Sequence, residues 1–117
     1  MTKRIVAGLA LVAALVVPLA AQYAVLEQVT VGATAVGFTA ATINAGSGHP
    51  EVGRAICRVR TAEISARWDG GTPTASVGTL FYVGDVIDIK SPLEVKRFLA
   101  IRTTSTSGQL DCTLTER

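Results

Sequence analysis

The amino-acid sequence predicts an all-β protein built as a single antiparallel β-sandwich, with an immunoglobulin-like or a jelly-roll strand order. The first observation is the period-two alternation of apolar and polar residues over 62–68, which is typical of a half-buried strand. The second is the turn chemistry of Asp69, Gly70 and Pro73, which ends that strand. The third is the close spacing of about seven such short patterns along the chain.

The first half of the chain after residue 24 contains two further patterns of this kind, separated by a loop. Residues 29–43 read as one bent or bulged strand or as a hairpin, because alternating valines are followed by β-branched and small residues. Residues 44–50 are a loop by their glycine, serine and proline content. Residues 55–59 alternate again, and the alternation slips by one residue near Thr61, so we expect a bulge or a strand boundary there.

The second half continues in the same way. We expect strands over residues 77–83 and 86–89, separated by a bend at Gly84 and Asp85. Residues 90–92 form a loop, and residues 95–102 read as a further strand with Phe98 on one of two partly covered faces. A polar turn over 103–108 precedes a terminal strand over 110–114, whose alternation turns Cys112 inward.

Length and composition bound the organisation. The 117 residues are enough for one domain, which we place at residues 25–117, after an apolar segment at residues 1–24. Residues 25–117 hold nine basic and nine acidic residues, because two of the 11 basic residues, Lys3 and Arg4, precede the apolar run. This balance gives no indication of a nucleic-acid-binding face.

The segment at residues 1–24 has the layout of a secretory signal, with a positive start, an apolar middle and a small-residue end. Cleavage after Ala21 would place Leu19 at the third position back, and cleavage after Ala24 would place Gln22 there, so neither site is of the Ala-x-Ala type. We expect the segment to be retained, either as a helix among partner subunits or across a membrane through residues 5–24. Removal of the segment is the alternative.

The chain offers little for catalysis, metals or cofactors. His49 is the only histidine and lies in the predicted loop, without a fixed partner for a nucleophile. The spacing of Cys57 and Cys112 is not that of a metal site, and the aspartates at 69, 85 and 88 form no calcium-loop pattern. The glycines match no nucleotide-binding motif. We therefore expect a protein that is not an enzyme and uses no cofactor or metal.

Several residues are expected to have structural roles. Alternation places Cys57 and Cys112 on inward positions of strands that could be neighbours across the sandwich. Assembly in a reducing cytoplasm predicts free thiols, whereas secretion predicts a disulfide, and we expect the thiols. Trp68 is expected to cap the core rather than to serve as a sugar platform. The structural set is Cys57, Trp68, Asp69, Gly70, Pro73, Gly84, Asp85, Phe98 and Cys112.

Arginines form the densest basic group, at positions 54, 58, 60 and 67. Arg58, Arg60 and Arg67 are expected to face solvent, with a subunit interface as the alternative.

The stretches VTVGATAVGFTAATI, AEISARWDGGTPTASVGTLFYVGD and FLAIRTTSTSGQLDCTLT together resemble small structural proteins of tailed-bacteriophage virions. The similarity covers about residues 29–115 and lies in turn and core positions. It implies a β-sandwich that assembles, as a homo-oligomer and with other virion proteins, as a capsid decoration, connector or tail component. The DG-x-x-PT turn also resembles immunoglobulin-like modules of secreted sugar-cleaving enzymes. The alternative is a secreted or membrane-anchored bacterial β-sandwich that binds a surface polymer, and the signal-like segment from Lys3 to Ala24 favours it.

Overall fold

The computed structural model describes residues 23–46 and 48–116, which form seven strands and two short helices. The predicted apolar segment at residues 1–24 lies almost entirely outside the described residues, so its helical form and its retention stay predictions. In the described ranges, the helices are too short to cross a membrane. The elements are β1 (Ala24–Val31), α2 (Ala40–Ile43), β2 (Val52–Arg60), β3 (Ile64–Arg67), β4 (Thr79–Phe81), β5 (Val86–Ile89), α3 (Pro92–Arg97), β6 (Leu99–Arg102) and β7 (Gly108–Glu116).

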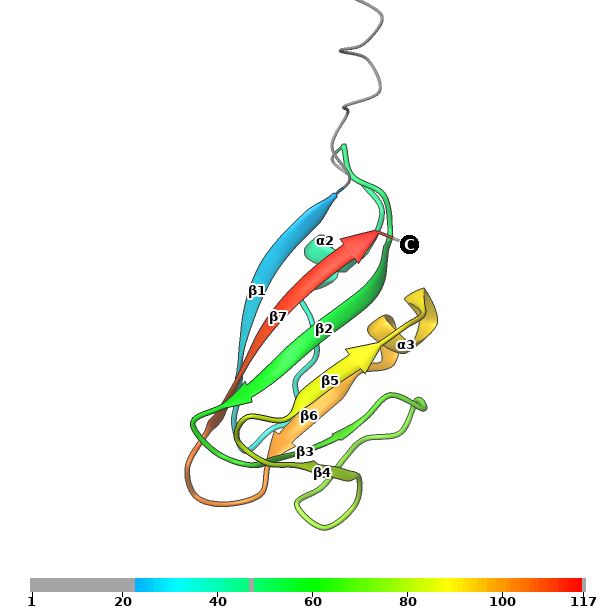
Figure 1. The fold of residues 1–117 in the computed structure, drawn as a ribbon. Coiled ribbons are helices and arrows are strands. Elements are labelled where there is room, and N and C mark those ends of the chain that lie inside the picture. Colours follow the sequence, from blue (N-terminus) through cyan, green and yellow to red (C-terminus); the bar gives the residue numbers. More distant parts are fainter. Residues whose placement is uncertain (1–22, 47, 117) are drawn as a thin grey trace, which may run out of the picture.

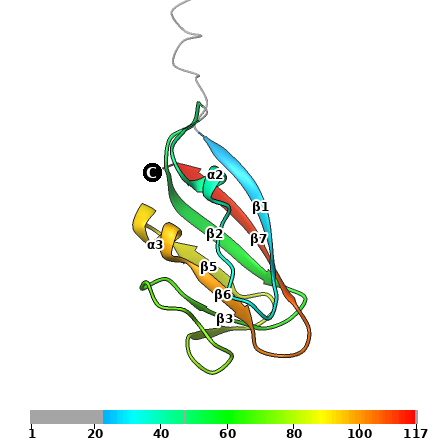
Figure 2. The same ribbon diagram turned by 180° about the vertical axis from the view of Figure 1, so that it is seen from behind.

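The strands form two antiparallel sheets, which confirms the predicted antiparallel sandwich. One sheet has the order β1-β7-β2-β5 and the other the order β4-β3-β6. Figures 1 and 2 show that the second sheet and α2 lie on the same face of the four-stranded sheet. The opposite face of the four-stranded sheet is covered by none of the described elements, and we call it the outer face.

The segment between β1 and α2 departs from the prediction for residues 29–43. The first strand ends at Val31, and the chain then crosses to the second layer, where Val36 pairs with Ala100 of β6 through two backbone hydrogen bonds of 2.9 Å. A single turn of helix, α2, follows. The prediction of one strand or hairpin over residues 29–43 was wrong, because Val36 pairs with a strand that is distant in the sequence.

The core lies between the two layers and consists of the inward residues of both sheets. Alternation places Leu110, Cys112 and Leu114 of β7 fully inside, as predicted. Phe98 is the largest fully buried side chain, and its ring stacks on that of Phe38 with 5.0 Å between the centroids. Burial of such side chains is the main source of the stability of a sandwich of this size.

Two predicted strands in the second half are shorter than expected. Only residues 79–81 of the stretch 77–83 pair in a sheet. Residues 95–102 divide into the end of α3 and the strand β6. The helix begins because the Ser91 hydroxyl accepts a hydrogen bond from the Glu94 amide and Pro92 occupies the first turn. The sequence Ser-Pro-Leu-Glu carries this capping signal, which the strand interpretation missed.

Candidate functional site

Cys57 and Cys112 are joined by a disulfide, so the expectation of free thiols was wrong. The two residues are directly opposite each other in β2 and β7, neighbouring strands of one sheet, and not across the sandwich. Their Cα atoms are 4.0 Å apart, and the two residues form a pair that does not exchange backbone hydrogen bonds, which is the closer of the two kinds of pair in an antiparallel sheet. We based the expectation of free thiols on assembly in a reducing cytoplasm. Whether the two sulfur atoms are close enough to bond depends instead on the register of the strands.

Trp68 packs at the rim of the core. Its ring lies 6.1 Å from the ring of Phe81 and 6.2 Å from that of Phe98, measured between centroids. The indole, directly after β3, thus packs against β4 and against the residue between α3 and β6, while it stays partly exposed. Its placement is that of a side chain that covers the edge of the core.

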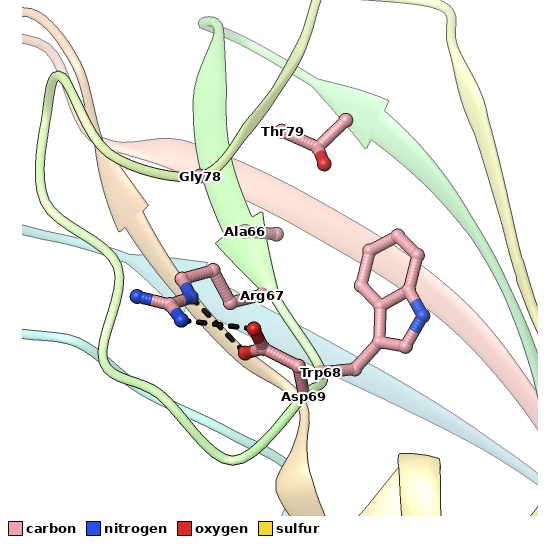
Figure 3. Close-up of a pocket in the computed structure, with 6 residues that line it drawn as sticks. All are labelled: Ala66, Arg67, Trp68, Asp69, Gly78 and Thr79. Atoms are coloured by element: carbon pink, nitrogen blue, oxygen red, sulfur yellow. Dashed lines mark hydrogen bonds and ion pairs between the residues drawn. The ribbon is translucent and has the colours of Figure 1, made fainter.

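The loop from residue 69 to residue 78 is held by a polar cluster at its start. Arg67 donates two hydrogen bonds to Asp69, at 3.0 and 2.8 Å (Figure 3). The Gly71 amide donates a third to the same carboxylate, at 3.1 Å. These hydrogen bonds lower the pKa of Asp69 to about 2, and those from Arg67 have the largest effect. Gly70 takes a φ of +96°, which glycine adopts without strain.

The same loop folds back over β3. Pro73 is fully buried, and the Ser65 hydroxyl donates to the carbonyl of Val77 across 3.3 Å. Gly78 lies so close to this hydroxyl that an added Cβ would be 2.4 Å from it. The DG-x-x-PT turn at residues 69–74 and the pair Val77-Gly78 therefore belong to one ordered loop that lies over β3.

A shallow hollow of about 280 Å³ opens where β3 and β4 diverge. Figure 3 shows the indole of Trp68 on one side of it and the Arg67–Asp69 pair on the other. An aromatic wall beside an ion pair is chemically suited to a sugar or another polar ring. The lining residues are Ala66, Arg67, Trp68, Asp69, Gly78 and Thr79.

Gly84 and Asp85 make the turn that carries the chain from β4 to β5. The Asp85 amide donates to the carbonyl of Tyr82, and the Asp85 carboxylate accepts from the Tyr82 amide at 2.8 Å. Gly84 has a φ of +95°, as the third residue of a type II turn requires. Gly84 and Asp85 both bond to Val59, which is a bulge of two residues opposite one.

The three arginines of the predicted interface are not brought together. Arg58 and Arg60 both lie on the outer face, where Arg60 forms an ion pair with Asp111 at 2.9 Å. Arg67 belongs to the other sheet and is occupied by Asp69. A hollow of about 480 Å³ lies beside Arg58 and Arg60, at the end of β2.

Large exposed apolar side chains gather in one stretch of ten residues around β4 and β5. Val83 is 59% exposed and Tyr82 is 57% exposed, although both are of residue types that sheets normally bury. The sequence carries a sign of this surface, because residues 77–86 hold more apolar residues than a strand with one buried face needs. The five residues are Val77, Leu80, Tyr82, Val83 and Val86.

His49 lies in a loop, as predicted, and its ring stacks on that of Tyr23 with 4.4 Å between the centroids. In the described ranges, no three histidine, cysteine, aspartate or glutamate side chains come close enough together to hold a metal ion.

Comparison of the chain with protein-family models, with curated proteins and with solved structures found no match.

Proposed function

We propose that this protein is a non-enzymatic structural component of a phage particle, assembling through its sandwich as a capsid decoration, connector or tail protein. The observation that carries the proposal is the order in which the chain pairs. β1 pairs with β7, Val36 with β6, β2 with β5, and β3 with β4. The first half of the chain thus pairs with the second half in reverse order, like one long hairpin wrapped around a core.

This pairing supports a jelly-roll order for the sandwich rather than an immunoglobulin-like one. The segment at Val36 can be counted as the second of eight strands. The strand order is then 1-8-3-6 in one sheet and 2-7-4-5 in the other. Jelly rolls are frequent among viral capsid proteins and lectins. Because one fold serves many functions, the proposal also uses the exposed surfaces described above.

The placement of the motif residues supports the same proposal. The residues on which the resemblance to virion proteins rests include the DG-x-x-PT turn, Val77-Gly78 and Gly84-Asp85, and they build the loop over β3 and the turn before β5. They leave exposed the apolar stretch at residues 77–86, with Val86 at 53% exposure. An apolar surface on a small sandwich is typical of a protein that buries it against neighbours. Repetition on a symmetric lattice then raises the avidity of a weak contact.

The test is mass spectrometry and electron microscopy of particles purified from the source that encodes the chain. We expect peptides from residues 25–117 in many copies per particle, retained after a wash in high salt. Absence from purified particles, with recovery of the chain from the medium or the envelope, would contradict the proposal.

A second candidate is a secreted or membrane-anchored module that binds a surface polymer. The disulfide between Cys57 and Cys112 favours it, because structural disulfides persist mainly outside the cytoplasm. The hollow beside Trp68 would then be the sugar-binding surface.

Binding to a panel of bacterial surface polysaccharides tests this candidate. A Thr79→Trp variant should fill the hollow and abolish binding, whereas Thr104→Trp, an exposed change in the β6–β7 turn, should leave it unchanged. If the Thr79→Trp variant binds the polysaccharide as tightly as the Thr104→Trp control and the native chain, the hollow is excluded as the binding site.

A further inference from the structure

The four-stranded sheet has two edge strands, β1 and β5, and the charged residues near the end of β5 make that edge the one of interest. This strand pairs with β2 on one side and is the last in the sheet order. An unpaired edge presents a row of backbone donors and acceptors to any strand of suitable register. Strand β5 is therefore an edge at which another chain can extend the sheet.

The register identifies which backbone groups are available at this edge. The Val59 amide of β2 donates to the carbonyl of Asp85, so the Asp85 carbonyl points toward β2. Antiparallel pairs alternate between bonded and non-bonded, so Ile87 and Ile89 also bond toward β2. The amides and carbonyls of Val86 and Asp88 consequently point away from β2, and continued alternation gives Lys90 the same direction.

The side chains at this edge carry complementary charges. Asp88 is exposed on the outer face and Lys90 follows it two residues later on the same face. Lys90 belongs to none of the four ion pairs found among the described residues. Asp88 faces Arg54 from one side at 3.0 Å, and each carboxylate oxygen can accept a further bond.

We infer that β5 pairs antiparallel with β5 of a second copy, around a two-fold axis at Ile89. In that register Asp88 of each copy lies opposite Lys90 of the other, so two ion pairs form on the outer face. The outward amides and carbonyls of these two residues exchange four hydrogen bonds. The result is one continuous sheet of eight strands across the dimer.

A two-fold axis at Ile87 is less favourable. It would place Asp88 opposite Val86 of the second copy, where the carboxylate meets no cation. The charge pattern therefore selects the axis at Ile89. This inference deepens the assembly role proposed above and rests on it, since it names a copy of the same chain as the first partner.

Two charge variants of the full-length chain test the pairing. Lys90→Asp places aspartate opposite aspartate in a homodimer, and Asp88→Lys places lysine opposite lysine. We expect each variant alone to dimerise at least about tenfold more weakly than the native chain, because directly opposed like charges are unfavourable in antiparallel pairs. An equimolar mixture restores opposite charges at both positions, so native mass spectrometry should show the mixed dimer in excess over either homodimer.

Controls are Thr104→Asp and Thr104→Lys, which change charge in the exposed β6–β7 turn and should leave the native dimer unchanged. Hydrogen exchange gives a second readout that does not depend on charge. The amides of Asp88 and Lys90 should exchange more slowly as the native chain is concentrated, while the amide of Thr104 should not change.

The outcomes separate this inference from the proposed function. A native oligomer whose stability neither variant alters, or a native chain that is monomeric yet present in particles, would overturn the β5 pairing alone. A chain absent from particles whose dimer follows the charge pattern would support the pairing and refute the virion role.

Discussion

Cys57 and Cys112 occupy directly opposed positions of β2 and β7, and a disulfide joins them although they are 55 residues apart in the sequence. Both residues are fully buried. The disulfide therefore joins the two central strands of the four-stranded sheet. It lies on the inner face of the sheet and is part of the core.

The first prediction concerns this disulfide. Replacing both cysteines with alanine should lower the free energy of unfolding by about 4 kcal/mol, because closing a loop of this length restricts the unfolded chain. Denaturant unfolding of the native and double-variant chains measures the difference. Thiol counting in denaturant without reductant should find none in the native chain, and two reactive thiols would contradict the disulfide.

The second prediction concerns Gly37, in the segment that crosses from β1 to the second layer. A Cβ at this position would lie 2.5 Å from the carbonyl oxygen of Phe98, a backbone atom that cannot move aside. Gly37→Ala should therefore lower the free energy of unfolding by about 1–3 kcal/mol. Gly32→Ala is the matched control, because the nearest atom, the Ser107 hydroxyl oxygen, is 3.8 Å away. Equal effects of the two variants would count against the close approach.

The third prediction concerns Thr61, which joins β2 to β3. The Ala62 amide donates to the carbonyl of Arg60, and Thr61 between them has a φ of 77°. This is the rare, strained form of the γ-turn, and a β-branched residue is poorly suited to it.

Replacement by glycine removes that strain, so Thr61→Gly should raise the free energy of unfolding by about 1 kcal/mol. The same change at Thr72, an exposed loop residue with negative φ, should lower stability slightly, because glycine adds freedom to the unfolded chain. Thermal unfolding of the two variants compares them, and destabilisation by Thr61→Gly would refute the strained turn.

The fourth prediction concerns the pH dependence of Asp69. Its pKa is about 2 in the folded chain against 3.8 for an ordinary aspartate. A carboxyl group with a lowered folded pKa stabilises the folded state above its unfolded pKa, and that contribution is lost as the pH falls from about 4 to about 2.

Carboxyl-carbon NMR measures this titration directly. The Asp69 signal should shift with a midpoint near pH 2, and Arg67→Gln should move the midpoint toward 3.8. In the Arg54→Gln control, the midpoint of Asp69 should stay in place while the pKa of Asp88 rises, because Arg54 bonds only to Asp88. A native midpoint near 3.8 would exclude the bidentate pair.

Local patterns in the sequence are sufficient to predict the class of fold and many inward positions. Period-two alternation is a local property of a pleated strand, so β2 and β7 and their buried cysteines could be predicted from it. Turn residues with special backbone conformations, such as Gly70 and Gly84, could be predicted for the same local reason.

Which elements pair with one another became clear only from the three-dimensional fold. The stretch after Val31 has the composition of a strand, yet its partner, Ala100, lies more than 60 residues further along the chain. The disulfide depends on the register of β2 against β7, and the separation of Arg67 from Arg58 depends on which sheet each strand joins. Pairing between distant strands is set by the fit of whole faces around a core, which no local pattern contains.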